Sequence, residues 1–257
     1  MDYDEERAEG YDRRHASRFA EAEATADFLA ALAFAVVGAG DDDAPDAPPR
    51  VLELGIGTGR LALPLATRGL DVSGIDASKP MVDRLRAKPG ADAIPVALGD
   101  FADPAVLVDG PFALVVLAFN SLFELADQDA QCRCVAGVAS LLAPGGRFVV
   151  EALAPELTRL DHTLTVVSQA DDEVVLQATS HDPLAQVVVG HDVVLSPGEG
   201  GGVRLLPWTI RYASVPELDL MARLAGLVLA ERWGGWRREP FGATSARHVS
   251  VYGPATS

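Results

Sequence analysis

Three glycines placed at every second position could bring a polypeptide backbone very close to a bound ligand. Gly55, Gly57 and Gly59 follow an apolar run at 51–54, which is typical of a buried strand, and precede an apolar stretch that begins at Leu61 and predicts a helix. Glycine is needed in such a strand–turn–helix unit because a Cβ atom would block the turn and hold the ligand away from the backbone. The pattern is typical of the first unit of a nucleotide-binding α/β sheet.

Carboxylates follow or end three successive predicted strands. Glu53, Asp76 and Asp100 stand at these positions, and we expect them to face one crevice because the carboxyl ends of parallel strands meet at one edge of a sheet. Asp76 lies 23 positions after Glu53 (76 − 53), close to the spacing at which an acid accepts ribose hydroxyls. The chain has only two lysines, Lys79 and Lys88. An acidic crevice favours a positively charged ligand over the phosphates of NAD(P) or ATP.

The glycine spacing also departs from the dinucleotide pattern G-x-G-x-x-G, because the third glycine comes one place early and Arg60 stands where it should be. The motif E-x-G-x-G-x-G at 53–59 instead resembles motif I of the class I S-adenosylmethionine-dependent methyltransferases. The segment 76–81, Asp-Ala-Ser-Lys-Pro-Met, matches the D-x-S-x-x-M pattern of the same family, and 142–146 resembles its L-x-P-G-G turn. The resemblance covers about residues 50–152 and extends more loosely to 215–253.

The resemblance implies a role for each matching residue, with S-adenosyl-L-methionine as cofactor and S-adenosyl-L-homocysteine as product. The glycine turn would pack on the amino-acid part of the cofactor, an acid would bind the ribose, and a second acid and an aromatic residue would hold the adenine. A tyrosine of an N-terminal flap would touch the cofactor, and the end of the fourth strand would lie beside the methyl group. The cofactor-binding residues expected in this way are Tyr11, Glu53, Gly55, Gly57, Gly59, Asp76, Ala77, Met81, Asp100, Phe101, Phe119 and Asn120.

Several of these residues have a plainer alternative. Tyr11 could pack on its own helix, Met81 could serve only for packing, and Asp100 could cap the next turn. Phe119 could be a core aromatic residue and Asn120 a turn residue.

The expected fold class is α/β, a Rossmann-like, doubly wound, mostly parallel seven-stranded sheet whose last strand is antiparallel, with an antiparallel β insertion. We expect an N-terminal helical flap and acidic linker (1–49), a core (50–152 and 213–257), and the insertion (153–212) as a lid or dimer surface. Core strands are predicted at 51–54, 71–75, 94–98, 112–118, 147–152, 227–233 and 247–252, insertion strands at 163–167, 173–179, 186–195 and 203–212, and helices at 17–37, 127–142 and 215–224.

Methyl transfer to an amine or a hydroxyl often needs a base, and the insertion carries three histidines, His162, His181 and His191. Each is a weak candidate, because a single histidine is more often a structural or surface residue. The catalytic group is therefore unknown from the sequence. No spacing of histidines, cysteines or carboxylates predicts a metal site.

The 257 residues are sufficient for one large core or two small ones. A net charge of −16 argues against nucleic acid and anionic membranes as main partners. The acidic start, the absence of a long apolar run and the two cysteines, Cys132 and Cys134, predict a cytoplasmic protein with reduced thiols. We expect a methyltransferase acting on a nitrogen, oxygen or carbon of a small molecule, mainly by positioning and water exclusion. The alternatives are an NAD(P)-dependent oxidoreductase and a non-catalytic cofactor-binding protein of this fold.

Overall fold

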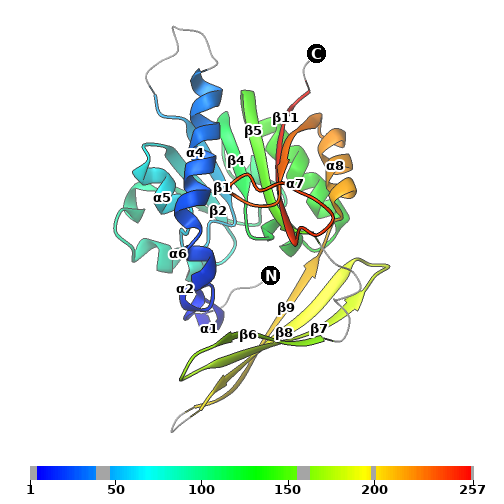
Figure 1. Ribbon diagram of the computed structural model, residues 1–257. Helices are drawn as coiled ribbons and strands as arrows, with labels where there is room; N and C mark the ends of the chain where they lie inside the picture. The colour runs from blue at the N-terminus through cyan, green and yellow to red at the C-terminus, as the bar shows by residue number, and fades with distance from the viewer. Residues whose placement is uncertain (1–4, 39–46, 155–162, 198–200, 256–257) are drawn as a thin grey trace.

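A seven-stranded sheet forms the centre of the molecule, with strand order β10-β11-β5-β4-β1-β2-β3. The computed structural model describes residues 5–38, 47–154, 163–197 and 201–255 (Figure 1). β11 runs antiparallel to both of its neighbours, and the other strands are parallel, which confirms the expected fold class. The strands are β1 (Arg50–Leu54), β2 (Asp71–Asp76), β3 (Val96–Leu98), β4 (Phe112–Leu117), β5 (Leu142–Leu153), β10 (Leu227–Trp233) and β11 (Arg247–Pro254).

Helices cover both faces of this sheet, so its central strands are apolar on both sides. Every residue of β4 is buried. One apolar cluster joins Leu29, Leu65 and Leu85, from three helices, to one face, and a second joins Val135 and Met221 to the other. The helices are α4 (Ala22–Gly38), α5 (Ala62–Thr67) and α6 (Lys79–Arg86) on the first face, and α7 (Gln128–Leu141) and α8 (Val215–Leu224) on the second.

The predicted insertion is a separate four-stranded antiparallel sheet, in the order β6-β7-β8-β9. Its strands are β6 (Thr163–Gln169), β7 (Val174–Asp182), β8 (Val187–Ser196) and β9 (Gly202–Arg211). Its inner face buries a small cluster of Val175, Val194 and Leu206. Its outer face exposes apolar side chains, among them Leu164 and Leu205, which are 66% and 60% exposed.

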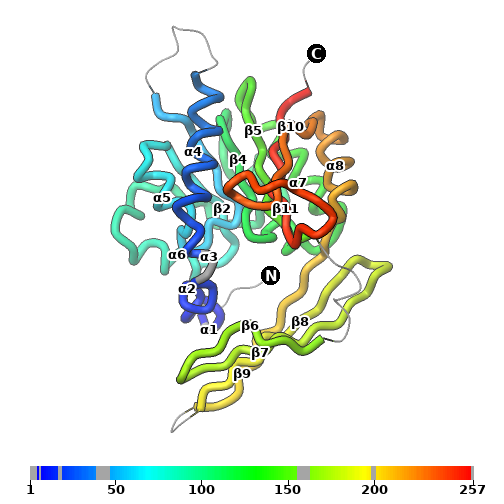
Figure 2. The backbone as a smooth tube through the Cα atoms, viewed as in Figure 1, coloured from blue at the N-terminus to red at the C-terminus, as the bar shows by residue number. Residues whose placement is uncertain are grey.

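Three short helices lie between the core and the second sheet (Figures 1 and 2). They are α1 (Glu5–Ala8), α2 (Tyr11–Arg14) and α3 (Ala16–Phe19). Lys88 fastens α2 to the core, because its ammonium lies 2.5 Å from the Asp12 carboxylate and also donates to the Thr58 carbonyl. The Thr58 hydroxyl donates to Asp12 as well, at 2.6 Å.

Some expected boundaries are wrong. The single helix predicted at 17–37 is broken at residues 20–21, where the Glu21 carboxylate forms an ion pair with Arg247. β3 is shorter than 94–98 because Pro95 has no N–H to donate to a neighbouring strand. β5 begins at Leu142, before the predicted glycine turn, because Leu142 already pairs with Phe112 of β4. Within the described residues, no helix is long and apolar enough to cross a membrane.

Candidate active site

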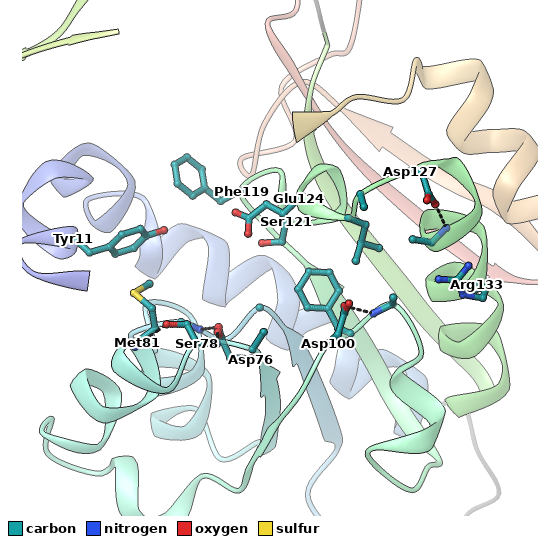
Figure 3. A pocket seen from close by; sticks show the side chains of 18 residues that line it. Tyr11, Asp76, Ser78, Met81, Asp100, Phe119, Ser121, Glu124, Asp127 and Arg133 are labelled. Carbon is teal, nitrogen blue, oxygen red and sulfur yellow. Dashed lines mark hydrogen bonds between the residues drawn. The ribbon is translucent and has the colours of Figure 1, made fainter. Parts of the chain in front are cut away.

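A cavity of about 340 Å³ opens beside the glycine turn, at the carboxyl end of the parallel strands. We call it the turn cavity. Figure 3 shows Tyr11 pointing into it from α2 and Ser121 and Glu124 facing it from the other side. It is lined by Tyr11, Gly55, Gly57, Asp76, Ala77, Ser78, Met81, Asp100, Phe101, Ala102, Phe119, Ser121, Glu124, Leu125, Ala126, Asp127, Ala130 and Arg133.

The glycine turn exposes its backbone to this cavity. Gly57 has a left-handed backbone (φ 55°), and a Cβ atom there would lie 3.3 Å from the Cε atom of Met81. A side chain at this position would therefore be strained and would enter the space beside the turn. Gly59 has a different role, because a Cβ there would lie only 2.3 Å from the Cδ1 atom of Leu85. Gly59 permits α6 to pack closely and does not line the cavity.

Asp76, at the end of β2, is fixed by two backbone donors. The Gly57 N–H donates to Oδ2 at 2.7 Å and the Ser78 N–H donates to Oδ1 at 2.8 Å. Ser78 itself caps α6 by accepting from the Met81 N–H. Burial raises the pKa of Asp76, and these two hydrogen bonds oppose that shift. Each carboxylate oxygen has a second lone pair, so a pair of ligand hydroxyls can still be accepted here.

Glu53 does not line the cavity, although the sequence predicted that it would face the crevice with the other two acids. Its side chain is 5% exposed, and its Oε2 atom has no hydrogen-bond partner. Burial raises the pKa of Glu53 to about 8. The carboxylates that line the cavity are instead those of Asp76, Asp100, Glu124 and Asp127. Glu124 was missed because it lies in a 3-10 turn after β4 and belongs to no motif.

The far end of the cavity combines a carboxylate with apolar surface. The Asp100 Oδ1 atom accepts from the Ala102 N–H at 2.8 Å, so this side chain does cap its own turn. It also lines the cavity, together with Phe101 and Leu125. An aromatic ring, a leucine and a fixed carboxylate can hold a flat base that carries an amino group.

Tyr11 closes the cavity on the side of the N-terminal helices. Burial raises the pKa of its hydroxyl, and the neighbouring Glu124 carboxylate raises it further. The ring of Tyr11 lies 4.5 Å from that of His15, and the His15 ring lies 5.2 Å from that of Phe119. The three rings form a continuous wall between α2 and the end of β4.

A second cavity, of about 230 Å³, is lined by all three of these rings, and we call it the junction cavity. It shares Tyr11, Phe119 and Glu124 with the turn cavity, so the two spaces adjoin at these residues. The N-terminal helices, the core and the second sheet each contribute to its lining, which consists of Arg7, Tyr11, Arg14, His15, Phe119, Asn120, Glu124, Leu153, Gln177, Asp192, Leu206, Trp208 and Ile210.

The histidines selected from the sequence do not line either cavity where the structure describes them. His181 has its Nε2 atom 2.8 Å from the Tyr212 hydroxyl. His191 is exposed and alternates with Asp192 on β8, so it faces away from the junction cavity. His162 lies outside the described residues. The histidine that lines the junction cavity is His15, which no motif in the sequence distinguishes from the other histidines.

The turn cavity fits an adenosyl ligand that carries a positive charge. Carboxylates provide acceptors for ribose hydroxyls and amino groups, and the bare glycine turn permits close approach. The cation that lines it, Arg133, lies near Asp127 on the far side in Figure 3 and not at the turn. The described residues contain no group of three or more histidines, cysteines and carboxylates that could hold a metal ion.

Comparison with known proteins identifies the family. A model described as a methyltransferase domain matches residues 51–146. The chain is 30% identical over 206 residues to the cypemycin N-terminal methyltransferase of Streptomyces sp, which covers 78% of this chain and 81% of that protein. This chain is a class I S-adenosylmethionine-dependent methyltransferase.

Solved structures agree with this assignment. The CcbJ methyltransferase from Streptomyces caelestis superposes with a TM-score of 0.80 at 44% identity, over 92% of this chain and 90% of that one. Streptomyces venezuelae DesVI gives a TM-score of 0.73 at 25% identity, over 96% and 98% of the two chains. Nothing in these comparisons supports the alternative of an NAD(P)-dependent oxidoreductase.

Proposed function

We propose that this methyltransferase transfers the methyl group of S-adenosylmethionine to an amine nitrogen of a small molecule held in the junction cavity. The observation that carries the proposal is the contact between the two cavities at Tyr11, Phe119 and Glu124. A cofactor in the turn cavity and an acceptor in the junction cavity would meet at these residues. S-adenosylmethionine supplies an electrophilic methyl group on a positively charged sulfur.

The roles expected for the cofactor-binding residues are part of this proposal. Asp76 would accept from the ribose hydroxyls, Asp100 and Phe101 would hold the adenine, and the turn at Gly55 and Gly57 would lie against the amino-acid part. Each of these residues lines the turn cavity, as do Ala77, Met81, Tyr11 and Phe119. Glu53, Gly59 and Asn120 do not line it, so we assign them no direct contact with the cofactor.

The carboxylates of the junction cavity support an amine as the acceptor. Asp192 is held by the side-chain N–H groups of Gln177 and Trp208, each at 3.0 Å, and Glu124 provides a second carboxylate. Fixed carboxylates attract an ammonium group into a partly dry site. Arg7 and Arg14 balance this negative charge, but both guanidinium groups are engaged with the chain, since Arg7 donates to the Pro207 carbonyl and Arg14 to that of Glu9. The cypemycin relative is named for methylation at an N-terminus, which is consistent with a nitrogen acceptor.

An ammonium nitrogen has no lone pair, so the acceptor must lose a proton before it attacks the methyl group. His15 and Glu124 line the junction cavity and are our candidates for receiving this proton. Most of the rate enhancement would come from alignment of the nitrogen with the methyl carbon and from exclusion of water by the wall of Tyr11, His15 and Phe119.

A panel of small amino alcohols tests the proposal, because each compound offers a nitrogen and an oxygen to the same site. Turnover with S-adenosylmethionine is followed by mass spectrometry, and NMR identifies the methylated atom. Methylation on nitrogen is expected. Methylation on oxygen by the wild-type protein would contradict the proposal.

Two histidine variants locate the acceptor. His15→Gln should lower turnover of the amine. The matched variant His191→Gln should not, because His191 lies on the face of β8 that is directed away from the junction cavity. Equal effects of the two variants would count against the junction cavity as the acceptor site.

We also propose the exposed apolar face of the second sheet as the contact surface of a homodimer. Leu164 and Leu205 lie on this face. Light scattering on the wild type and on Leu164→Asp would test it, since a charge should dissociate a dimer formed there.

A further inference from the structure

Two consecutive residues at the meeting point of the cavities have an unfavourable backbone conformation. Phe119 has φ 55° and Asn120 has φ 65°, and neither is a glycine. A left-handed conformation costs roughly 1 kcal/mol or more for a residue such as phenylalanine, whereas asparagine adopts it more readily, and for phenylalanine it persists only where neighbouring groups hold it. The loop after β4 is therefore kept in place by specific contacts.

Those contacts come from the end of β5. The Phe119 N–H donates to the Oε2 atom of Glu151 at 2.9 Å, and the Asn120 N–H donates to the Glu151 carbonyl at 3.1 Å. In return, the Leu153 N–H donates to the Oδ1 atom of Asn120 at 2.6 Å. Three hydrogen bonds thus tie the two left-handed residues to the neighbouring strand.

The Glu151 carboxylate is itself held in one orientation. Its side chain is 4% exposed, and its Oε1 atom lies 3.2 Å from Nη1 of Arg247 on β11. Arg247 also binds both oxygens of Glu21, at 2.7 and 3.0 Å, just before α4 begins. With one oxygen on Arg247, the other oxygen is aimed at the Phe119 N–H.

The ring of Phe119 is the part of this assembly that faces the reaction. It lines both cavities and lies against His15, and the guanidinium carbon of Arg60 is 6.0 Å from the ring centre. A shift of the Phe119 backbone would displace this ring from the point where methyl donor and acceptor meet. Misplacement by about 1 Å can cost an enzyme up to 100-fold in rate.

We propose that Glu151 is a positioning residue for methyl transfer: its carboxylate holds the Phe119 peptide in the left-handed conformation and so fixes the ring at the junction of donor and acceptor. This inference rests on the proposed function only in taking the junction cavity as the acceptor site. Glu151 lines neither the turn cavity nor the junction cavity, but a further cavity of about 360 Å³ that it shares with Phe119 and Arg247. Its hydrogen bond to the Phe119 N–H is its link to the point where the turn and junction cavities adjoin.

Two conservative substitutions separate the hydrogen bond from the charge. Glu151→Gln keeps an oxygen within reach of the Phe119 N–H and removes the charge. Glu151→Asp keeps the charge for Arg247 but is one methylene shorter, so it withdraws the oxygen from Phe119. We expect Glu151→Asp to lower kcat by about tenfold to 100-fold, and Glu151→Gln to stay within about threefold of the wild type. The dissociation constant for S-adenosylhomocysteine, measured by calorimetry, should change by less than about threefold in both, and this also shows that they are folded.

A double-mutant cycle shows whether the effect passes through the ring. In a Phe119→Ala background, Glu151→Asp should no longer lower kcat, because the group that it positions is gone. An undiminished loss in that background would overturn the proposal. The proposal would also be overturned if Glu151→Asp kept the kcat of the wild type and Glu151→Gln lowered it, since the carboxylate would then act through its charge.

The comparison uses whichever acceptor the wild-type protein methylates, on nitrogen or on oxygen. A wrong assignment of the acceptor atom would therefore appear in the wild-type product, whereas a wrong role for Glu151 would appear only in the variants.

Discussion

The two cavities that meet at Phe119 are constructed in different ways. The turn cavity is lined mostly by residues that follow successive core strands, and its central contacts involve backbone groups, such as the Gly57 N–H that donates to Asp76. The junction cavity is lined by side chains from three regions, including Arg7 and Trp208, which lie about 200 positions apart in the sequence. The difference indicates that the cofactor site depends on local backbone geometry and the acceptor site on tertiary packing.

The largest effect is expected at the glycine turn. Gly57→Val should abolish measurable binding of S-adenosylhomocysteine, a loss of more than about 100-fold, because the new side chain occupies the space beside the turn. Calorimetry measures the affinity. Gly69→Val is the matched control, since Gly69 also has a left-handed backbone (φ 81°) but nothing lies within 4 Å of a Cβ placed there. Gly69→Val should be less stable than the wild type but should bind S-adenosylhomocysteine with unchanged affinity. An equal loss of affinity in both would mean that strain, and not filled space, is responsible.

The buried acid under the turn should make stability depend on pH. The pKa of Glu53 is about 8 in the folded protein against 4.5 as its ordinary value, so the folded state binds more protons between these values. The contribution of protonated Glu53 to the stability of the folded protein is fully present below about pH 4.5 and is lost as the pH rises through 8. Glu53→Gln does not ionise, so at pH 9 it should exceed the wild type in stability by roughly 3 to 5 kcal/mol.

Urea denaturation of the ligand-free protein at pH 5 and pH 9 measures the difference. Asp83→Asn is the control, because Asp83 is exposed and paired with Lys79 on the surface of α6. It should leave the pH dependence of the wild type unchanged. Stability curves of wild type and Glu53→Gln that run parallel with pH would contradict the assignment.

A smaller effect is expected from the carboxylate beside the turn. Asp76→Ala should weaken binding of S-adenosylhomocysteine by about 1 to 3 kcal/mol, because ribose hydroxyls lose their acceptor and the Gly57 and Ser78 N–H groups lose theirs. Asp83→Ala, seven positions further along, should leave the calorimetric affinity unchanged. An affinity that is unaltered in Asp76→Ala would remove Asp76 from the cofactor site.

The difference between the two cavities also explains how much the sequence could predict. The glycine motif and Asp76 follow from local spacing, and the bounds of α8 (Val215–Leu224) and β10 (Leu227–Trp233) were predicted to the residue, because proline, glycine and the apolar pattern mark them locally. All four strands of the second sheet were predicted as well, since turn residues separate them.

The remaining features depend on contacts between distant segments. Glu53 was expected in the crevice. Its position within the strand does not show whether its side chain reaches the cavity or is buried beneath the glycine turn. At the break before α4, Glu21 forms an ion pair with Arg247, 226 positions away in the sequence, which no local pattern shows. Glu124 lies in a core turn that no local pattern marks, and Trp208 lines the junction cavity only because the second sheet packs against the rest of the molecule.

The smallest effect separates two adjacent residues of β8, on the acceptor side. Asp192 faces the junction cavity and accepts from Gln177 and Trp208, whereas His191 faces outward and is exposed. Asp192→Ala should raise the KM of an amine acceptor by about tenfold, because an ammonium loses a fixed carboxylate. It should leave the affinity for S-adenosylhomocysteine unchanged, and His191→Ala should alter neither quantity. If Asp192→Ala instead weakened cofactor binding with no change in the acceptor KM, the two cavities would not be separate donor and acceptor sites.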